Sequence, residues 1–576
     1  MPEYASQRNV QILVALLKEF GVRQAVISPG SRNMALVRSL ESDPYFTCHS
    51  IVDERSAVYF AIGVSTAEQN SPVLLSSTSA QATRNYIPGM TEAYHRGTPL
   101  VIVTADYDIS MIGQGIMQTL DQMSIPHDAA KSSVRLPLVR TDAEAAYCTR
   151  LVNESLLELR HHGSGPVHID IPIDEHWVGS VDSLPKVPAL SRHVPGDELP
   201  SLDGKRVLIA VGQHAPFSKA EQAAIDAFAD RYDAVIYTNH LSNCHGPRTV
   251  QASLLVERMD TTNWAKHQPD VLLTIGGQIG EYGFDQKAKT GRFEHWRVHE
   301  DGKVQDTFGK LTRVFEYRER DFFDAYSARR EVSGPTAYFQ QWAKGNARRN
   351  IPADLPLSHA FVGATLAPML PENAVVHFAI LSSLRNWNYF ELHPSIEGYS
   401  NVSAFGIDGC LSTFIGHSVA TDRPAYLVIG DLSFFYDMNA VGIRSVKDNV
   451  RVILVNNSGG GEFQLYSHAA NQFFGDGADT HIAAAGHNGS ARGWVESMGW
   501  DYIGVTTKDD LHAHSSRFVG SSEKPILMEV FTTMSDDSDG VQIIREANTL
   551  ESMQGRIGRR LPPRAKKAIK AMMGRK

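Results

Sequence analysis

The chain has 576 residues, of which 42% are hydrophobic and 21% are charged. These proportions are those of an ordinary globular protein, and the length predicts about three domains of roughly 150–200 residues each. The net charge of −9 argues against a nucleic-acid binder. Four cysteines without a CxxC pair, together with no visible signal sequence or long apolar run, lead us to expect a cytoplasmic location.

Three stretches of alternating helix and strand patterns follow one another along the chain. The first opens with a helical period over residues 10–17 and continues with predicted strands at 25–27, 73–75, 100–103 and 167–171. After a Pro-rich linker at 178–200, the second has predicted strands at Val207–Val211, 235–237 and Val271–Ile275, but no GxGxxG motif. After a boundary near 348–356, the third has predicted strands at Val375–Phe378, 425–429, 451–455 and Ile526–Phe531. We therefore predict an α/β fold with three domains, each a mostly parallel sheet flanked by helices.

The third stretch carries an acid and an amide directly after two neighbouring buried strands. Asp431 follows one strand, and Asn457 follows the next with a glycine run at 459–461. Parallel strands bring such residues to the carboxyl edge of the sheet, where ligands of open α/β sheets bind. Asp, Asn and carbonyl oxygens suit Mg²⁺, and Gly-rich turns bring N–H groups close to phosphate. The alternative is ordinary turn chemistry, a helix N-cap and an Asn-Gly turn.

The 26-residue spacing of Asp431 and Asn457 resembles the diphosphate motif of thiamine-diphosphate enzymes. The resemblance implies thiamine diphosphate and Mg²⁺ as cofactors, with the metal held by Asp431, Asn457 and the Gly459 carbonyl. It also implies that Glu54, in Asp53-Glu-Arg-Ser-Ala57, contacts the aminopyrimidine as the catalytic acid. The remaining implied cofactor contacts are Ile407, Gly430, Leu432, Ser433 and Gly460. Taken alone, Glu54 could equally be a solvated acid at a helix N-terminus.

Further motifs are similar to one branch of these enzymes, the 2-succinyl-5-enolpyruvyl-6-hydroxy-3-cyclohexene-1-carboxylate synthases of menaquinone biosynthesis. They are Ser28-Pro-Gly-Ser-Arg32, Gly406-Ile-Asp-Gly409, Gly430-Asp-Leu-Ser433 and Gly165-Pro-Val-His-Ile-Asp-Ile-Pro172. The resemblance implies a transferase that decarboxylates a 2-oxo acid, 2-oxoglutarate, and adds the acyl carbanion equivalent to an acceptor, isochorismate. It implies a pyrimidine-binding domain at 1–180, a Rossmann-like middle domain at 181–350, a diphosphate-binding domain at 351–545 and a basic tail at 546–576. Family members are homodimers or homotetramers with the active site at the subunit interface.

The predicted substrate pocket departs from the family pattern. Tyr107 replaces an arginine, Gln81 lies in an altered Thr-Ser-Gly-Thr-Ala segment, and Glu462 replaces an aliphatic residue. Since both family substrates are carboxylates, lost arginines weaken recognition. The candidate substrate contacts are Ser31, Arg32, Gln81, Tyr107, Gln118, Ser382, Arg385 and Glu462. The alternative function is a related 2-oxo acid decarboxylase or carboligase with another substrate, in secondary or cell-envelope metabolism.

Other interpretations stay open at this point. Gly416-His-Ser-Val-Ala420 resembles a hydrolase nucleophile elbow around Ser418, and a binding protein without catalysis on the same fold is a further alternative. Residues 467–490 could form a lid or a surface loop. Residues 556–576 carry nine Lys or Arg and no acid, which fits either a disordered tail or a peripheral contact with the inner face of a membrane.

Overall fold

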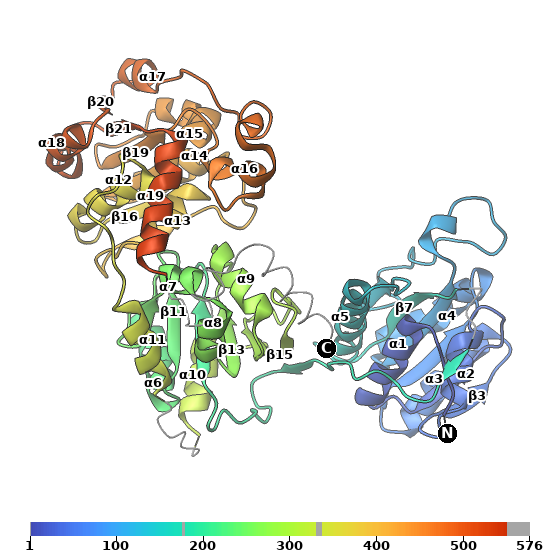
Figure 1. The fold of residues 1–576 in the computed structure, drawn as a ribbon. Helices are drawn as coiled ribbons and strands as arrows, with labels where there is room; N and C mark the ends of the chain where they lie inside the picture. Colours follow the sequence, from blue (N-terminus) through green and yellow to red (C-terminus); the bar gives the residue numbers. More distant parts are fainter. Residues whose placement is uncertain (1, 175–178, 330–336, 550–576) are drawn as a thin grey trace, which may run out of the picture. The chain divides into compact units, whose positions relative to one another are not determined.

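The computed structural model describes residues 2–174, 179–329 and 337–549 (Figure 1). The chain forms two compact units, one of Met1–His193 with Leu311–Val314 and the other of Val194–Lys310 with Phe315–Lys576. The predicted basic tail lies largely outside the described residues. Among the residues described, none of the helices has both the length and the apolar character needed to cross a membrane.

The first unit is built on a sheet of six parallel strands in the order β3-β2-β4-β5-β7-β6. Its strands are β2 (Gln24–Ile27), β3 (Thr47–Ser50), β4 (Val73–Ser77), β5 (Leu100–Asp106), β6 (Ser132–Arg135) and β7 (Val167–Pro172). Its helices are α1 (Arg8–Glu19), α2 (Met34–Glu41), α3 (Glu54–Ala67), α4 (Gln81–Arg96) and α5 (Asp142–Glu158). Short elements are β1 (Tyr4–Ala5), β8 (Ser180–Val181), β9 (Ser191–His193) and the 3-10 turn Ile109–Met111.

Side chains along each strand point alternately to the two faces of this sheet, and helices cover both faces. Val101 and Val103 of β5 pack into one core with α1, α2 and α5, whereas Leu100 and Ile102 pack into a second core with α3 and α4. A strand buried on both faces needs an unbroken apolar run, because successive side chains point to opposite sides. The apolar runs of the sequence are therefore the central strands.

The second unit begins with a sheet in which the neighbours β12-β11-β10-β13-β14 are parallel. These strands are β10 (Val207–Val211), β11 (Val235–Thr238), β12 (Thr249–Gln251), β13 (Val271–Ile275) and β14 (Glu294–Val298), and β15 (Leu311–Phe315) follows in the chain. The helices are α6 (Lys219–Arg231), α7 (Ser253–Arg258), α8 (Thr261–His267), α9 (Tyr282–Thr290), α10 (Glu319–Ser327) and α11 (Tyr338–Asn346). Helix α6 starts with a capping box, in which Ser218 and Glu221 satisfy each other's backbone N–H groups.

The same unit contains a third sheet of six parallel strands in the order β17-β16-β18-β19-β21-β20. Its strands are β16 (Val375–Phe378), β17 (Glu397–Tyr399), β18 (Ala425–Gly430), β19 (Val450–Asn456), β20 (Asp501–Val505) and β21 (Ile526–Phe531). Its helices are α12 (His359–Leu366), α13 (Ser382–Trp387), α14 (Cys410–Val419), α15 (Asp431–Tyr436), α16 (Ala469–Phe474), α17 (Arg492–Ser497), α18 (Lys508–Val519) and α19 (Met534–Ala547). The 3-10 turns are Ala367–Met369, Met438–Gly442, Gly461–Gln464 and Gly475–Ala478.

The first and third sheets share one strand order. Numbered along the chain, their strands lie in the order 2-1-3-4-6-5 in both cases. The candidate residues follow the carboxyl ends of the first four strands in each sheet, and the carboxyl edge is where ligands of parallel sheets bind. The predicted α/β fold with mostly parallel sheets is confirmed, and the proposed domain boundaries stay a prediction.

Candidate active site

The carboxyl edge of the third sheet brings Asp431 and Gly459 together. Asp431 is the first residue of α15, directly after β18, and is only 2% exposed. Its Oδ1 accepts a hydrogen bond from Leu432 N at 2.7 Å, and its Oδ2 accepts one from Gly459 N at 3.0 Å. Burial raises the pKa of Asp431, while the backbone donors and His487 oppose that shift. The strand end therefore holds a carboxylate in an environment where a cation would stabilise its charged form.

Asn457 offers a buried oxygen to the same edge. Its Nδ2 donates to Asp537 Oδ2 at 2.7 Å, which fixes the orientation of the amide. Its Oδ1 is buried and has no hydrogen-bond partner in the structure. A buried acceptor without a partner destabilises a protein by about 1–3 kcal/mol, so such an atom calls for a ligand. Burial also raises the pKa of Asp537 to about 6.

The glycines after Asn457 are required by a close approach of two chain segments. A Cβ on Gly459 would lie 2.7 Å from Ala485 Cα, and one on Gly460 would lie 2.9 Å from Ala483 O. Gly460 N donates to Ala483 O at 2.5 Å. With Asp431 and Asn457, the Gly459 carbonyl gives a set of hard oxygen donors of the kind that Mg²⁺ prefers. A Cβ on Gly430 would meet no atom within 4 Å, which leaves room for a bound group. These residues fit a magnesium ion and a diphosphate.

His487 is a residue of this edge that the sequence analysis missed. Its Nε2 lies 3.1 Å from Asp431 Oδ2, and its Nδ1 accepts from Gly489 N at 3.1 Å. Since Nδ1 is an acceptor, Nε2 carries the proton and donates to Asp431. The ring also stands edge-on to Phe435 at 5.5 Å. His487 lies 56 positions after Asp431 in the segment proposed as a lid, and no local sequence pattern connects the two.

Ile407 and Ser433 meet at the same end of the sheet. Ser433 is buried in the first turn of α15 and donates from Oγ to the Ile407 carbonyl at 2.5 Å. The Ile407 side chain is partly buried against the core that contains α12 and α13. Leu432, between Asp431 and Ser433, is half-buried. The structure thus groups the predicted cofactor residues of the second unit around one turn.

Glu54, the predicted catalytic acid, is the first residue of α3 in the first unit. Asp53 caps this helix by accepting from Arg55 N at 2.9 Å and Ser56 N at 3.4 Å. Because Asp53 performs the capping, the carboxylate of Glu54 is not used for it. Glu54 is half-buried, and its Oε2 accepts from Asn85 Nδ2 of α4 at 3.0 Å. Neighbouring helices therefore orient this carboxylate.

The substrate candidates of the first unit lie at the carboxyl edge of its sheet. The Arg32 guanidinium lies over the ring of Tyr107, 3.6 Å from its centroid, and Tyr107 is 9% exposed. Tyr107, which we predicted to replace an arginine of the family, therefore packs against another arginine. The side chains of Ser31, Gln81 and Gln118 are exposed.

A buried polar network lies beneath these residues and was not predicted. Arg135 donates to Asp106 at 3.0 Å and to Asp170 at 2.6 Å. Gln122 Nε2 donates to Asp170 at 2.8 Å, and its Oε1 accepts from Ala80 N at 2.8 Å. Burial, together with repulsion from Asp170, raises the pKa of Asp106 to about 7. The network holds the loop after β5 against the strand ends.

In the second unit Arg385, Ser382 and Glu462 form one cluster. Both terminal nitrogens of the Arg385 guanidinium donate to Glu462, Nη1 to Oε2 at 2.7 Å and Nη2 to Oε1 at 2.8 Å. Ser382 Oγ donates to Glu462 Oε2 at 3.2 Å. Burial lowers the pKa of Arg385, but the ion pair outweighs this and holds the pKa above its usual value. The predicted carboxylate-binding arginine is thus already bound to a carboxylate.

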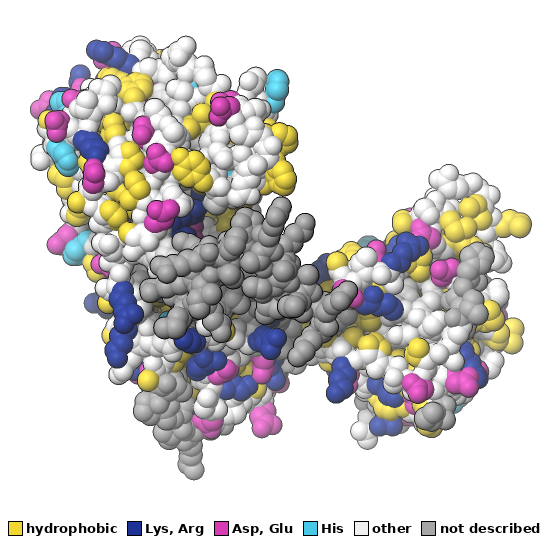
Figure 2. All heavy atoms as spheres, viewed as in Figure 1, with side chains coloured by type: hydrophobic (Ala, Val, Ile, Leu, Met, Phe, Trp, Pro, Cys, Tyr) yellow, Lys and Arg dark blue, Asp and Glu magenta, His cyan; other side chains and the backbone are white. Residues whose placement is uncertain are grey.

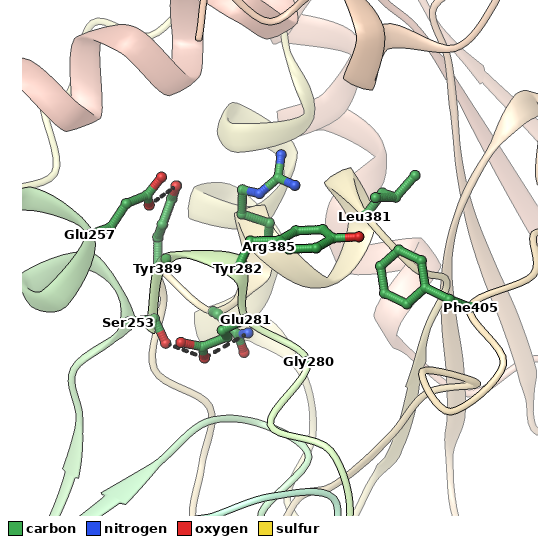
Figure 3. Close-up of a pocket in the computed structure, with 11 residues that line it drawn as sticks. Ser253, Glu257, Gly280, Glu281, Tyr282, Leu381, Arg385, Tyr389 and Phe405 are labelled. Atoms are coloured by element: carbon green, nitrogen blue, oxygen red, sulfur yellow. Dashed lines mark hydrogen bonds between the residues drawn. The ribbon is translucent and has the colours of Figure 1, made fainter. Parts of the chain in front are cut away.

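Arg385 also lines a pocket formed by the α13 region, α7 and the start of α9 (Figure 3). The lining residues include Tyr282, Leu381 and Phe405, whose side chains surround one end of the pocket in this view. At the other end Glu257 accepts from Tyr389 Oη at 2.6 Å. The remaining lining residues are Ser253, Gly280, Glu281, Gly283 and Asn388. The pocket lining combines apolar side chains with a few polar groups.

The structure argues against the hydrolase interpretation. Ser418 lies near the end of α14 and is fully buried. Its Oγ donates to Ile415 O at 2.8 Å within the same helix. A nucleophile elbow needs an exposed serine on a turn between a strand and a helix, so Ser418 is no candidate nucleophile.

Comparisons with known proteins agree with this geometry. Residues 8–125 match the family model described as "Thiamine pyrophosphate enzyme, N-terminal TPP binding domain". Three relatives are named 2-succinyl-5-enolpyruvyl-6-hydroxy-3-cyclohexene-1-carboxylate synthase. The Bacteroides thetaiotaomicron protein is 34% identical over 93% of this chain and 98% of its own length. The corresponding values are 34%, 93% and 97% for Phocaeicola vulgatus, and 30%, 91% and 95% for Flavobacterium psychrophilum.

These matches confirm the resemblance inferred from the motifs, and with it a transferase that uses thiamine diphosphate and a divalent metal ion such as Mg²⁺. The chain belongs to the 2-succinyl-5-enolpyruvyl-6-hydroxy-3-cyclohexene-1-carboxylate synthase family of thiamine-diphosphate enzymes.

Proposed function

We propose that the protein decarboxylates 2-oxoglutarate and transfers the resulting succinyl unit to isochorismate, the reaction that the motif resemblance implies. The observation that carries this proposal is the oxygen-rich edge of the third sheet. There a buried carboxylate, Asp431, accepts a hydrogen bond from Gly459 N, two residues after Asn457, whose side-chain oxygen is buried without a partner. The names of the relatives, which describe a succinyl-bearing cyclohexene carboxylate, support the choice of substrates.

In this proposal the second unit holds the metal and the diphosphate. Asp431, Asn457 and the Gly459 carbonyl would ligate Mg²⁺, and the turns at Gly430 and Gly460 would bring backbone N–H groups to the diphosphate. Asn457 is oriented for this role in advance, because Asp537 holds its amide nitrogen at 2.7 Å. A ligand fixed before binding loses little conformational freedom when the ion arrives.

The first unit would supply the acid. Bound thiamine diphosphate supplies the electron sink for decarboxylation. Glu54 would hold a proton at the aminopyrimidine nitrogen, with Asn85 keeping its carboxylate in place through the 3.0 Å hydrogen bond. Ile407 would support the coenzyme from the side, since Ser433 fixes its backbone carbonyl. Arg32 and Arg385 would be the cationic contacts for substrate carboxylates.

We further propose a homodimer or homotetramer with the active site at the subunit interface, as is general among thiamine-diphosphate enzymes. Large apolar side chains are exposed close to the candidate residues of both units, and hydrophobic side chains are visible on the surface in Figure 2. Val52 is 80% exposed two positions before Glu54, and Met117 is 86% exposed next to Gln118. In the second unit Tyr436 of α15 is 71% exposed. Such surfaces are typical of interaction sites.

A second candidate function is the same cofactor chemistry with a different acceptor. Two observations favour it. Tyr107 stands where the family has an arginine and stacks on Arg32, and Arg385 is bound by Glu462. Both reduce the positive charge available to a dicarboxylic substrate.

The test is an assay of the purified protein with thiamine diphosphate, Mg²⁺, 2-oxoglutarate and isochorismate. We expect CO₂ release coupled to consumption of both substrates. CO₂ release without isochorismate consumption would favour the second candidate. No thermal stabilisation by thiamine diphosphate with Mg²⁺, and no turnover, would refute the cofactor assignment itself.

We also propose a cytoplasmic enzyme whose basic residues 556–576 contact an anionic membrane; these residues lie outside the described part of the chain. Liposome co-sedimentation of the full chain and of a chain lacking 556–576 tests this. Equal binding of the two would refute it.

A further inference from the structure

The ion pair of Arg385 and Glu462 is enclosed and uses the whole guanidinium fork. The side chains are 19% and 13% exposed, respectively. Two parallel hydrogen bonds of 2.7 and 2.8 Å give the bidentate geometry that an arginine otherwise offers to a bound carboxylate. Ser382 adds a third donor to the same carboxylate at 3.2 Å. Glu462 therefore makes the contacts that a substrate carboxylate would make.

Among the described residues, Arg385 is the one cationic side chain that lines the pocket beside it. The acidic side chains of the lining are Glu257 and Glu281. Glu257 pairs with Arg545, and Glu281 accepts from Ser253 Oγ at 2.6 Å. An anionic ligand entering this pocket thus has Arg385 as its one cationic partner in the lining.

The position of Glu462 ties this pair to the candidate metal turn. Glu462 lies in the 3-10 turn Gly461–Gln464, two residues after Gly460, and Arg385 lies on α13 after strand β16, which pairs with β18. Both therefore belong to the carboxyl edge that carries Asp431 and Asn457. A substrate that reacts at this edge would present its carboxylate to Arg385.

We propose that Glu462 is a specificity-determining residue that occupies Arg385 as an internal carboxylate and competes with acidic substrates for it. Binding of a substrate carboxylate requires that Glu462 leave the guanidinium. The pair thus lowers the affinity of the pocket for dicarboxylates and raises the relative affinity for ligands without a carboxylate at this position. This inference deepens the proposed function, because it rests on a substrate that binds at this edge.

The experiment measures succinate binding to the holoprotein by titration calorimetry. Succinate has two carboxylates and no 2-oxo group, so no turnover interferes. In Glu462→Gln the amide keeps the shape of the side chain but removes its charge. We expect this variant to bind succinate at least tenfold more tightly than the wild type, which corresponds to 1.4 kcal/mol. The double variant Arg385→Gln/Glu462→Gln should lose this gain.

A matched control is Glu397→Gln, which removes the acid of another ion pair of the third sheet, 2.5 Å from Arg423. It should bind succinate as the wild type does. If Glu462→Gln does not fold, Glu462→Met gives the same comparison with a side chain of equal length. Equal succinate affinity of the wild type and the folded Glu462 variant, or a gain that survives in the double variant, would overturn the inference. Absence of the synthase reaction in the wild type, with the succinate gain of Glu462→Gln intact, would refute the proposed substrates and leave the inference standing.

Discussion

Replacing Gly459 by alanine tests the structural basis of the candidate metal turn. The added Cβ would lie 2.7 Å from Ala485 Cα and 3.2 Å from Ala483 O, both backbone atoms. Ordinary carbon contacts lie at about 3.5–4.0 Å, so the segment at 483–486 must retreat by about 1 Å. Overpacking of this kind destabilises a protein by about 1–3 kcal/mol.

The same displacement should also weaken binding of the metal and the cofactor. The segment is held by hydrogen bonds from Gly460 N to Ala483 O and from Gly486 N to Ser458 O, at 2.5 and 2.9 Å. Moving it shifts the Gly459 carbonyl, and Mg²⁺ tolerates little deviation from octahedral distances of about 2.0–2.1 Å. We expect Gly459→Ala to lower the melting temperature of the cofactor-free protein and to weaken magnesium-dependent binding of thiamine diphosphate at least tenfold, measured by calorimetry.

The matched control is Gly493→Ala in α17, where an added Cβ meets no atom within 4 Å. Alanine is favoured over glycine in a helix by about 1 kcal/mol, so this variant should be neutral or slightly stabilised. If Gly459→Ala had the stability and cofactor affinity of Gly493→Ala, the close approach of residues 459 and 485 would not limit this turn.

Three further predictions concern the acid, the metal and pH. Glu54→Gln should lower turnover by about 10²–10⁴-fold, as expected for a lost general acid, whereas Glu92→Gln on the exposed side of α4 should not; a loss within twofold would contradict the role of Glu54. Removing Mg²⁺ with EDTA should abolish the thermal stabilisation by thiamine diphosphate, and a shift that persists would contradict metal ligation by Asp431 and Asn457. The pKa of Asp106 is about 7 in the folded protein but about 3.9 in an unfolded chain. Protonated Asp106 therefore stabilises the folded protein fully below about pH 4, and this stabilisation is lost as the pH rises to about 7. The melting temperature of Asp106→Asn should fall less than that of the wild type over this range, and parallel pH profiles would argue against the raised pKa.

Most central strands could be predicted from the sequence, but the edge strands of the first sheet and the inner strands β14 and β15 could not. Strands β10, β13, β16 and β21 have the predicted bounds, because each is a mostly apolar run that is buried along nearly its whole length. The missed strands β3 (Thr-Cys-His-Ser) and β6 (Ser-Ser-Val-Arg) lie at the two edges of the first sheet, where burial is partial. An edge strand has a neighbour on one side only and needs no apolar run, so its sequence resembles that of a loop.

The candidate site shows the same division between local and long-range information. Residues that follow strands directly, such as Asp431 and Asn457, were found because strand ends are visible in the sequence. Their partners were not, since His487 and Asp537 approach them across 56 and 80 positions. The sequence showed Glu462 as an unusual acid. It could not show that Glu462 binds Arg385, which lies 77 positions earlier. Tertiary packing, not periodicity, decides these contacts.

Two helices at the candidate edges begin with a backbone conformation that side chains rarely adopt. Ala80 precedes α4 with φ 65° and ψ −117°, and Leu381 precedes α13 with φ 64° and ψ −123°. Each such residue stores about 1–3 kcal/mol of strain, which the surrounding packing must hold in place. A glycine at either position would relieve this strain but would also let the peptide rotate. The side chains of Ala80 and Leu381 thus make the local backbone less stable but keep it rigid. This rigidity fixes the placement of the next residues, Gln81 and Ser382.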